Sequence, residues 1–202
     1  MKKALLFLNG MPPAQLPQNL ADYQIIACTD GAYSNYLMQT AITVDYIIGD
    51  LDSLTVSPAD IEIIPTPDQN KTDFEKALLF LMAQDIHHVD IYGATGKASD
   101  HFLGNLSTGL QYHSQLSLNF YDDYNCLFFA DKQQLKLEHV KDKIISLLPF
   151  PVAKSVSLQG FVYPLTNTDL TFGQFISLRN QAKEDTVEIS FESGNLLICI
   201  NQ

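Results

Sequence analysis

Residues 61–92 read IEIIPTPDQNKTDFEKALLFLMAQDIHHVDIY and contain one strand–helix–strand unit. Ile61–Ile64 and Val89–Tyr92 are short runs rich in Ile and Val, as in strands buried inside a sheet. The segment Asp73–Gln84 between them has helical periodicity, because its apolar residues recur at spacings of three and four. These residues are Phe74, Ala77, Leu78 and Leu81. The unit therefore predicts two buried strands joined by an amphipathic helix.

The same alternation of strands and helices extends through the first 124 residues. Thr72 is placed to cap the helix described above, with Glu75 three residues later as the acid of a capping box. Further strands are expected at Ala4–Leu8, Gln24–Thr29 and Asp45–Ile48, and further helices at Ala32–Gln39 and His101–His113. This order predicts an α/β fold, with a mostly parallel sheet and flanking helices. Such sheets bind ligands beyond the carboxyl ends of their strands.

The pattern changes near residue 125, after which no convincing helix is expected. Short segments there alternate apolar and polar residues with period two: Leu135–Glu138, Ser155–Leu158, Thr171–Phe172, Phe175–Leu178 and Val187–Phe191. Turn signals such as Gln159-Gly160 separate them at the spacing of a small sandwich or barrel. We therefore expect an α/β domain over residues 1–124 and an all-β sandwich domain over residues 125–202.

The amino-acid composition of the chain limits the kinds of molecule that it is expected to bind. The chain has 202 residues and a net charge of −11, and residues 1–125 hold 5 basic against 15 acidic side chains. Nucleic-acid binders carry a basic footprint, so a nucleic-acid partner is not expected. An acidic half without basic partners suggests bound cations, with solubility as the alternative explanation. No apolar stretch reaches the length of a membrane span, so no membrane partner is expected. Three widely spaced cysteines, Cys28, Cys126 and Cys199, are expected to be buried free thiols of a reducing cytoplasm.

Acidic residues follow the predicted strands at the edge where such sheets bind ligands. These residues are Asp30, Asp50, Asp52, Asp73 and Asp100. If the backbone stays extended through Asp50-Leu51-Asp52, its two carboxylates point to the same side. A divalent cation would relieve their repulsion, and Mg²⁺ suits the site because substrate phosphates can complete its shell. Taken singly, each Asp could instead cap a helix or make an Asx turn.

A glycine-rich turn, Gly93-Ala-Thr-Gly-Lys97, follows the last predicted strand of this half. A P-loop needs four residues between its glycines and Ser or Thr after its Lys, and here only two intervene and Ala98 follows. The turn is therefore not a Walker A loop. Its backbone N–H groups can still face an anion at a helix N-terminus.

Taken in order, several strings resemble the thiamine pyrophosphokinase family over almost the whole chain. They are Asp-Gly-Ala at Asp30, Gly-Asp-Leu-Asp-Ser at Gly49–Ser53, the string at Asp68–Leu78, Gly-Ala-Thr-Gly-x-x-x-Asp-His at Gly93–His101, Gly160–Leu165, Leu170–Gly173 and Ser177–Asn180. The resemblance implies transfer of a pyrophosphoryl group from Mg²⁺-ATP to the thiamine hydroxyl, which gives thiamine diphosphate and AMP. It also implies a homodimer, with thiamine held between the first domain of one subunit and the second domain of its partner.

The resemblance further implies roles for individual residues. The expected catalytic and metal-binding residues are Asp50, Asp52, Asp73 and Asp100. The expected ATP-binding residues are Asp30, Lys71, Thr72, Gly93, Thr95, Gly96, Lys97 and His101. The expected thiamine-binding residues are Gln69, Asp73, Ser177 and Asn180. Either Asp73 or Asp100 is left as the acceptor of the hydroxyl proton.

Two departures from the family pattern leave alternatives open. Ala98 occupies the usual position of an Arg, and Lys97 offers a point charge one residue earlier without the bidentate geometry of Arg. The Ser-Asn-Glu common near the C-terminus of relatives is altered to Ser177-Leu-Arg-Asn-Gln181. The alternatives are a diphosphokinase acting on another primary alcohol, such as a hydroxymethyl-pterin, and a non-catalytic sensor of thiamine or nucleotide.

Overall fold

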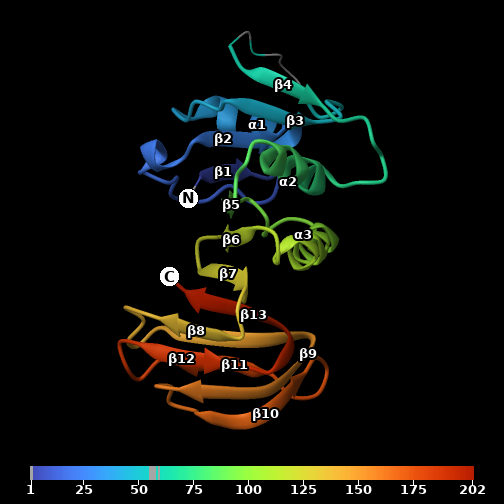
Figure 1. The fold of residues 1–202 in the computed structure, drawn as a ribbon. Coiled ribbons are helices and arrows are strands. Elements are labelled where there is room, and N and C mark those ends of the chain that lie inside the picture. The colour runs from blue at the N-terminus through green and yellow to red at the C-terminus, as the bar shows by residue number, and fades with distance from the viewer. Residues whose placement is uncertain (1, 55–57, 59) are drawn as a thin grey trace. The chain divides into compact units, whose positions relative to one another are not determined.

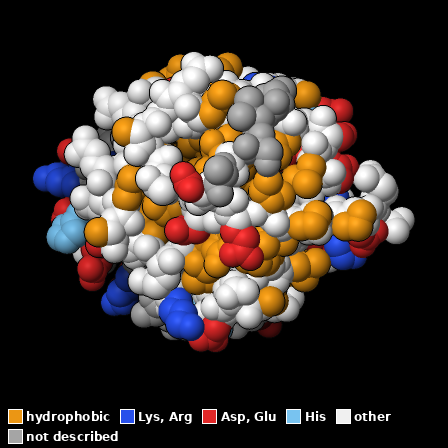
Figure 2. Space-filling model, turned by 90° about the horizontal axis from the view of Figure 1, so that it is seen from above, with side chains coloured by type: hydrophobic (Ala, Val, Ile, Leu, Met, Phe, Trp, Pro, Cys, Tyr) orange, Lys and Arg blue, Asp and Glu red, His pale blue; other side chains and the backbone are white. Residues whose placement is uncertain are grey.

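A computed structural model describes residues 2–54, 58 and 60–202. The chain forms two compact units, Met1–Asp123 and Tyr124–Gln202. None of the described helices is long and apolar enough to cross a membrane. On the face seen in Figure 2, acidic side chains reach the middle of the view, whereas the Lys and Arg side chains lie toward its rim.

The first unit contains a parallel sheet in the order β4-β3-β2-β1-β5-β6 (Figure 1). Its strands are β1 (Lys3–Phe7), β2 (Ile25–Thr29), β3 (Tyr46–Gly49), β4 (Glu62–Pro65), β5 (His88–Tyr92) and β6 (Ser117–Tyr121). Every neighbouring pair in this order is parallel. The carboxyl ends of the strands therefore meet along one edge, as the alternating sequence predicted.

Helices cover both faces of this sheet. They are α1 (Asp30–Asn35), α2 (Asp73–Ala83) and α3 (Ser99–Tyr112), with the short 3-10 turns η1 (Leu20–Asp22) and η2 (Leu37–Gln39). In Figure 1, α1 lies behind the sheet, and α2 and α3 lie in front of it. The four predicted apolar residues of α2 are all buried: Phe74, Ala77, Leu78 and Leu81. Hydrophobic burial of that stripe fixes α2 against the sheet.

Three expectations for this unit need correction. The helix expected at Ala32–Gln39 begins at Asp30 and ends at Asn35, where Tyr36 leaves the helical conformation, and a separate 3-10 turn follows. The strand expected at Ile61–Ile64 is at the sheet edge and only partly buried, so its apolar pattern overstated its burial. The strand β6 was not predicted at all.

The second unit is antiparallel and contains no described helix. Its strands are β7 (Asn125–Phe129), β8 (Gln134–Leu137), β9 (Ile144–Gln159), β10 (Leu165–Thr171), β11 (Ser177–Gln181), β12 (Val187–Ser190) and β13 (Ser193–Asn201). The long β9 pairs with β10, β11, β12 and β13. One cluster of buried apolar side chains, including Ile145, Val156 and Ile198, forms the core. The predicted all-β region is confirmed.

The sequence pattern missed parts of this unit. The strands expected at Thr171–Phe172 and Phe175–Leu178 are the end of β10 and the start of β11, joined by a turn in which Gly173 has φ +86°. The strands β7 and β13, most of β10 and residues 144–154 of β9 were not predicted. The expectation that all three cysteines are buried is correct for Cys28 only, since Cys126 and Cys199 are partly exposed.

Candidate active site

A cavity of about 600 Å³ opens at the carboxyl ends of the parallel strands. Residues that follow β1, β2, β3 and β5 line it, together with the first turns of α2 and α3. Eleven of the residues expected from the sequence line this cavity: Asp30, Asp50, Gln69, Lys71, Thr72, Asp73, Gly93, Thr95, Lys97, Asp100 and His101. Chain segments far apart in sequence thus meet at one pocket.

Asp30 is the buried carboxylate of this pocket. It directly follows β2 and begins α1, and only 2% of its surface is exposed. Its Oδ1 accepts the backbone N–H of Gly31 at 2.7 Å, and its Oδ2 accepts that of Ser53 at 3.4 Å. Gly49 makes this position possible, because a Cβ at residue 49 would lie 2.8 Å from the Asp30 Cγ. Burial raises the pKa of Asp30, and repulsion from Asp73 and Asp50 raises it further.

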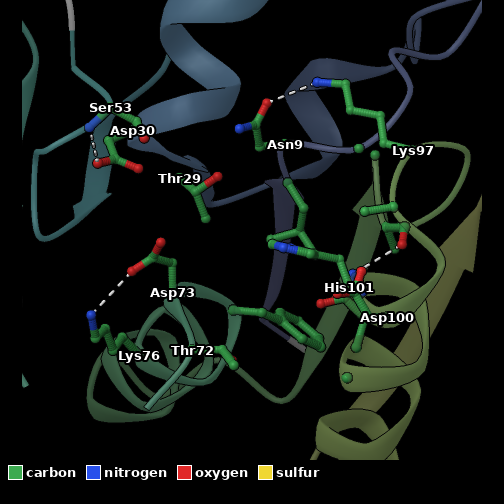
Figure 3. Close-up of a pocket in the computed structure, with 18 of the residues that line it drawn as sticks. Asn9, Thr29, Asp30, Ser53, Thr72, Asp73, Lys76, Lys97, Asp100 and His101 are labelled. Carbon is green, nitrogen blue, oxygen red and sulfur yellow. Dashed lines mark hydrogen bonds and ion pairs between the residues drawn. The ribbon is translucent and has the colours of Figure 1, made fainter. Parts of the chain in front are cut away.

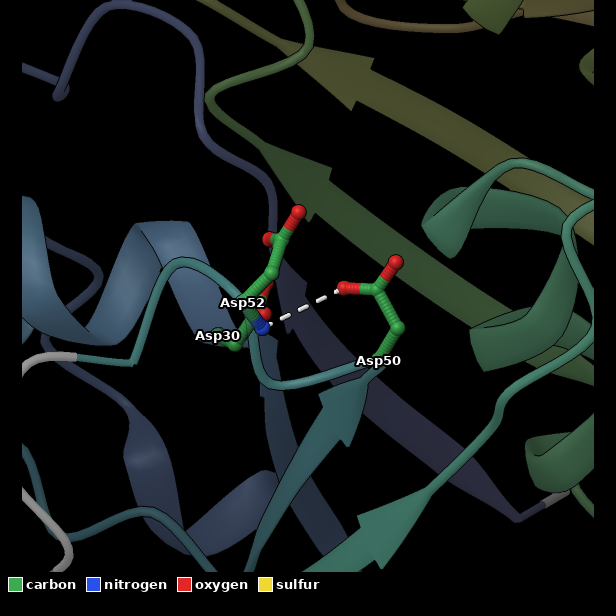
Figure 4. A group of neighbouring side chains, drawn as sticks. All are labelled: Asp30, Asp50 and Asp52. Atoms are coloured by element: carbon green, nitrogen blue, oxygen red, sulfur yellow. Dashed lines mark hydrogen bonds between the residues drawn. The ribbon is translucent and has the colours of Figure 1, made fainter.

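The Asp50–Ser53 segment forms a turn, so the expectation of an extended backbone is wrong. Leu51 has φ +70°, and the Leu54 N–H donates to the Leu51 carbonyl at 3.3 Å. Within this turn the Asp52 N–H donates to Asp50 Oδ1 at 3.4 Å (Figure 4). The two carboxylates still come together, but by chain reversal and not by strand alternation.

Carboxylate oxygens of Asp30, Asp50 and Asp52 all lie within 4.8 Å of one another, the spacing of a possible metal site (Figure 4). The other two residues expected in the metal set, Asp73 and Asp100, are not part of this group. The carboxylate of Asp73 pairs with Lys76 and points toward the end of β2 (Figure 3), while Asp100 accepts the His101 N–H at 2.9 Å. Asp30, which was expected to bind ATP, belongs to the group instead.

Neighbouring polar side chains hold the carboxylates of Asp50 and Asp52 in place. The Gln69 side chain donates to Asp50 Oδ2 at 2.9 Å, and this hydrogen bond is the main reason that the pKa of Asp50 is lowered. The Ser53 hydroxyl donates to Asp52 Oδ1 at 3.0 Å. Asp50 thus stays ionised beside Asp30, whose own ionisation is disfavoured. This arrangement is suited to a cation.

The first turn of α2 brings both signs of charge to the pocket. Thr72 caps this helix as predicted, since its hydroxyl accepts the Glu75 N–H at 3.2 Å. The carboxylate of Glu75 accepts the Tyr112 hydroxyl at 2.9 Å. Lys76 is nearly buried and pairs with Asp73 at 3.1 Å, whereas Lys71 lies 3.8 Å from the carboxylate of Asp68.

The glycine-rich turn after β5 forms the opposite wall. Gly93 has φ +70°, and a Cβ there would lie 2.2 Å from the Leu8 carbonyl oxygen, so glycine is required. The Thr95 hydroxyl donates to the Asp122 carboxylate at 3.2 Å. The Lys97 ammonium reaches back across the turn and donates to Asn9 Oδ1 at 3.0 Å (Figure 3).

Two expected thiamine-binding residues, Ser177 and Asn180, belong to the second unit. The Asn180 side chain is 2% exposed, donates to the Tyr163 carbonyl at 2.8 Å and accepts the Tyr163 N–H at 3.1 Å. It also accepts the Gln181 N–H at 2.9 Å. Asn180 therefore fixes the backbone beside Tyr163, and its contact with thiamine stays a prediction.

The pocket residues to which sequence reasoning gave no role include Asn9, Ser53 and Lys76. Lys76 carried a usable signal, because it lies three residues after Asp73 on a predicted helix, the spacing of an intrahelical ion pair. Ser53 was quoted within the Gly49–Ser53 motif but given no role. Nothing in the local pattern of Asn9 indicated that it would meet Lys97, which is 88 residues away.

Comparison with known proteins agrees with this geometry. Residues 16–120 match the family described as thiamin pyrophosphokinase, catalytic domain, and residues 132–196 match its vitamin B1 binding domain. Thiamine pyrophosphokinase of Bacillus subtilis is 27% identical over 136 residues, which is 65% of this chain and 63% of that protein. Thiamine pyrophosphokinase 1 of Arabidopsis thaliana is 26% identical, with 96% of this chain and 84% of that protein covered.

Solved structures share the fold. The crystal structure of the Bacillus subtilis thiamine pyrophosphokinase has a TM-score of 0.82 at 23% identity, covering 98% of this chain and 99% of that one. Yeast thiamin pyrophosphokinase has a TM-score of 0.80 at 17% identity, covering 99% and 86%. The two family matches together span both compact units. The chain therefore belongs to the thiamin pyrophosphokinase family.

Proposed function

We propose that this protein is a thiamine pyrophosphokinase, which transfers the pyrophosphoryl group of Mg²⁺-ATP to the hydroxyl of thiamine and releases AMP. The observation that carries the proposal is the meeting of Asp30, Asp50 and Asp52, the first two of which line the pocket. Transfer of phosphoryl-type groups depends on positioning and on neutralising charge, so this arrangement supplies what the reaction needs. Family membership supports the choice of substrates.

The donor set fits magnesium, which prefers oxygen ligands and is bound through a few carboxylates together with substrate phosphates. Asp30, Asp50 and Asp52 would hold the ion. When bound, it neutralises negative charge on the triphosphate. Asp50 is already ionised before a cation binds, because the hydrogen bond from Gln69 lowers the pKa of Asp50. Asp30 is buried, and no Lys, Arg or His in the described ranges forms an ion pair with it, so a divalent ion would relieve the cost of its negative charge.

Other pocket residues would orient the two substrates. The ammonium groups of Lys71 and Lys97 would face the triphosphate, and Thr72 would keep the start of α2 in place beside it. The remaining carboxylates, Asp73 and Asp100, are the candidates for accepting the thiamine hydroxyl proton. Thiamine carries a fixed positive charge, which the excess of acids in this unit would attract.

The two units would divide the work. The α/β domain, residues 1–124, would bind ATP and magnesium and hold the reacting groups, and the β-sandwich domain, residues 125–202, would bind thiamine. Ser177, with Gln69 and Asp73, would contact the vitamin, and a homodimer would place this site between subunits. The match of residues 132–196 to a vitamin B1 binding domain supports the role of the second domain.

An AMP-release assay tests the proposal. Purified protein with ATP should form AMP only when both thiamine and Mg²⁺ are present, and thiamine diphosphate should accumulate in equal amount. A parallel reaction with a hydroxymethyl-pterin as acceptor separates the alternative substrate class. Tight thiamine binding with no AMP formed would instead identify a sensor and overturn the proposal.

A further inference from the structure

The segment after β1 is bonded to the glycine-rich turn after β5. The Leu8 N–H donates to the Tyr92 carbonyl at 2.8 Å, and the Gly10 N–H donates to the Gly93 carbonyl at 2.7 Å. A Cβ at residue 10 would lie 2.2 Å from that Gly93 oxygen, so only glycine allows this approach. The backbone on both sides of Asn9 is therefore fixed to the turn that carries Lys97.

The Asn9 side chain joins three segments of the pocket wall. Its Oδ1 accepts the Asn35 side-chain amide at 2.7 Å and the Lys97 ammonium at 3.0 Å (Figure 3). A Cβ at Gly31 would lie 2.3 Å from the Asn9 Nδ2, so the amide occupies the space that this glycine leaves. Two donors use both lone pairs of the Asn9 oxygen. The side chain is thus held in one orientation, and it holds the Lys97 ammonium.

Lys97 differs from the other lysines of the pocket in the charge of its partner. Lys71 and Lys76 each lie near a carboxylate, that of Asp68 and that of Asp73. Over the described part of the chain, no carboxylate oxygen lies within 4.0 Å of the Lys97 ammonium, and the group that holds it is a neutral amide. No ion pair with a described carboxylate therefore offsets the charge of Lys97, although the hydrogen bond to Asn9 holds its side chain.

We propose that Asn9 is a positioning residue, which holds Lys97 at the pocket wall for an anionic phosphate group and leaves the lysine charge unneutralised. The inference rests on the proposed function in that the phosphate is taken to belong to ATP. An amide at residue 9 suits this role better than a carboxylate or an apolar side chain does. An aspartate at residue 9 would form an ion pair with Lys97 and reduce its attraction for a phosphate, and an alanine would leave the flexible lysine side chain unrestrained.

Nucleotide binding by a small set of variants tests the proposal. Calorimetry with α,β-methylene-ATP and Mg²⁺ compares wild type with Asn9→Ala, Asn9→Asp, Lys97→Ala and the double variant N9A/K97A. Lys97→Ala and Asn9→Asp should each weaken binding about tenfold, and Asn9→Ala should weaken it less. The double variant should bind no more weakly than Lys97→Ala, because Asn9 acts through that lysine.

Controls separate positioning from general damage. Lys141→Ala removes an exposed positive charge in the second unit and should leave binding unchanged. Thermal midpoints identify variants that merely unfold, and a steady-state KM for thiamine that is unchanged in Asn9→Asp restricts the effect to the nucleotide. Wild-type binding by Asn9→Asp, or additive losses in the double variant, would overturn the inference.

The same set distinguishes this inference from the proposed function. If wild type binds the analogue but releases no AMP with thiamine, the function fails while the binding comparison still decides the role of Asn9. If wild type releases AMP and Asn9→Asp binds as wild type does, the role of Asn9 fails alone. No binding of the analogue by wild type would overturn the inference as well.

Discussion

Two buried carboxylates of the parallel sheet, Asp90 and Asp30, are compensated in opposite ways. Asp90 is 3% exposed, and four side chains donate to it: Lys3 and Tyr23 at 2.7 Å, His88 at 3.0 Å and Asn119 at 3.1 Å. Burial raises the pKa of Asp90, but the hydrogen bonds from these partners outweigh burial and lower the pKa to about 2. The protein itself satisfies this charge.

Asp30 is as deeply buried, at 2% exposed, but from the described residues it receives only backbone N–H groups, and it has acidic neighbours. Its pKa is raised, by burial first and then by Asp73 and Asp50. This difference between Asp90 and Asp30 indicates where a ligand is expected to bind. A buried charge that the fold compensates is structural, and one that the fold leaves uncompensated is a candidate for an external cation.

The largest expected effect is the loss of turnover when a carboxylate of the group Asp30, Asp50 and Asp52 is removed. Asp50→Ala or Asp52→Ala should lower kcat at least ~10²-fold, because each removes a carboxylate from the proposed metal site. The AMP-release assay at saturating ATP and Mg²⁺ measures this. Asp22→Ala, which removes an exposed carboxylate of η1, is the matched control and should retain wild-type turnover. Full activity in both pocket variants would refute the metal assignment.

The largest expected effect on stability is at Asp90. Asp90→Ala leaves the partially buried ammonium of Lys3 and three other side-chain donors without their acceptor, so the free energy of unfolding should fall by about 3 kcal/mol. Urea unfolding followed by circular dichroism measures it. Glu188→Ala, at an exposed ion pair with Lys136, should change stability little. Equal effects of the two substitutions would show that the Asp90 network contributes nothing special.

Acid should remove the same contribution from wild type. The pKa of Asp90 is about 2 in the folded protein, below its ordinary value of 3.8, so its stabilisation is complete above pH 4 and is lost as pH falls toward 2. About 2 kcal/mol should disappear across that window. Unfolding free energies measured from pH 6 to pH 2 should fall less steeply in Asp90→Asn than in wild type. Parallel curves would contradict the assignment.

The smallest expected effect is a gain in stability, whereas the substitutions at Asp90 should lower it. Asp30→Asn removes a buried charge that faces other acids, so the metal-free protein should gain about 0.5–1 kcal/mol of stability at pH 7. Turnover should nevertheless fall, since the substitution removes a proposed magnesium ligand. Thermal unfolding with chelator present, beside the AMP assay, measures both. A loss of stability like that expected for Asp90→Ala would show that Asp30 is a structural carboxylate as well.

The sequence allowed the acidic residues at the carboxyl ends of the strands to be predicted, but not the hydrogen-bond network around Asp90. Asp30, Asp50 and Asp73 each follow a predicted strand, and parallel strands bring their carboxyl ends together. The network around Asp90 gave no such signal, because its donors come from four separate segments and show no fixed spacing. The contact between Lys97 and Asn9 was hidden for the same reason, although Lys97 itself was expected at the site.

Local backbone conformation was the other limit. The extended backbone expected at Asp50-Leu51-Asp52 is a turn, because Leu51 adopts a positive φ that a non-glycine residue rarely takes. That turn brings Asp52 to Asp30, so the three-residue group could not be deduced from strand alternation. By contrast, the apolar stripe and Thr72 cap of α2 followed directly from sequence, since both depend on neighbours within one helix.

The central claim is that Asp30, Asp50 and Asp52 hold a divalent ion against a triphosphate. Crystals grown with Mn²⁺ and α,β-methylene-ATP test it most directly, because Mn²⁺ can substitute for Mg²⁺ and gives an anomalous signal. The account predicts a peak within coordinating distance of at least two of these carboxylates and of phosphate oxygens of the analogue. A bound analogue with Mn²⁺ elsewhere, and the three carboxylates engaged only by the protein, would contradict it.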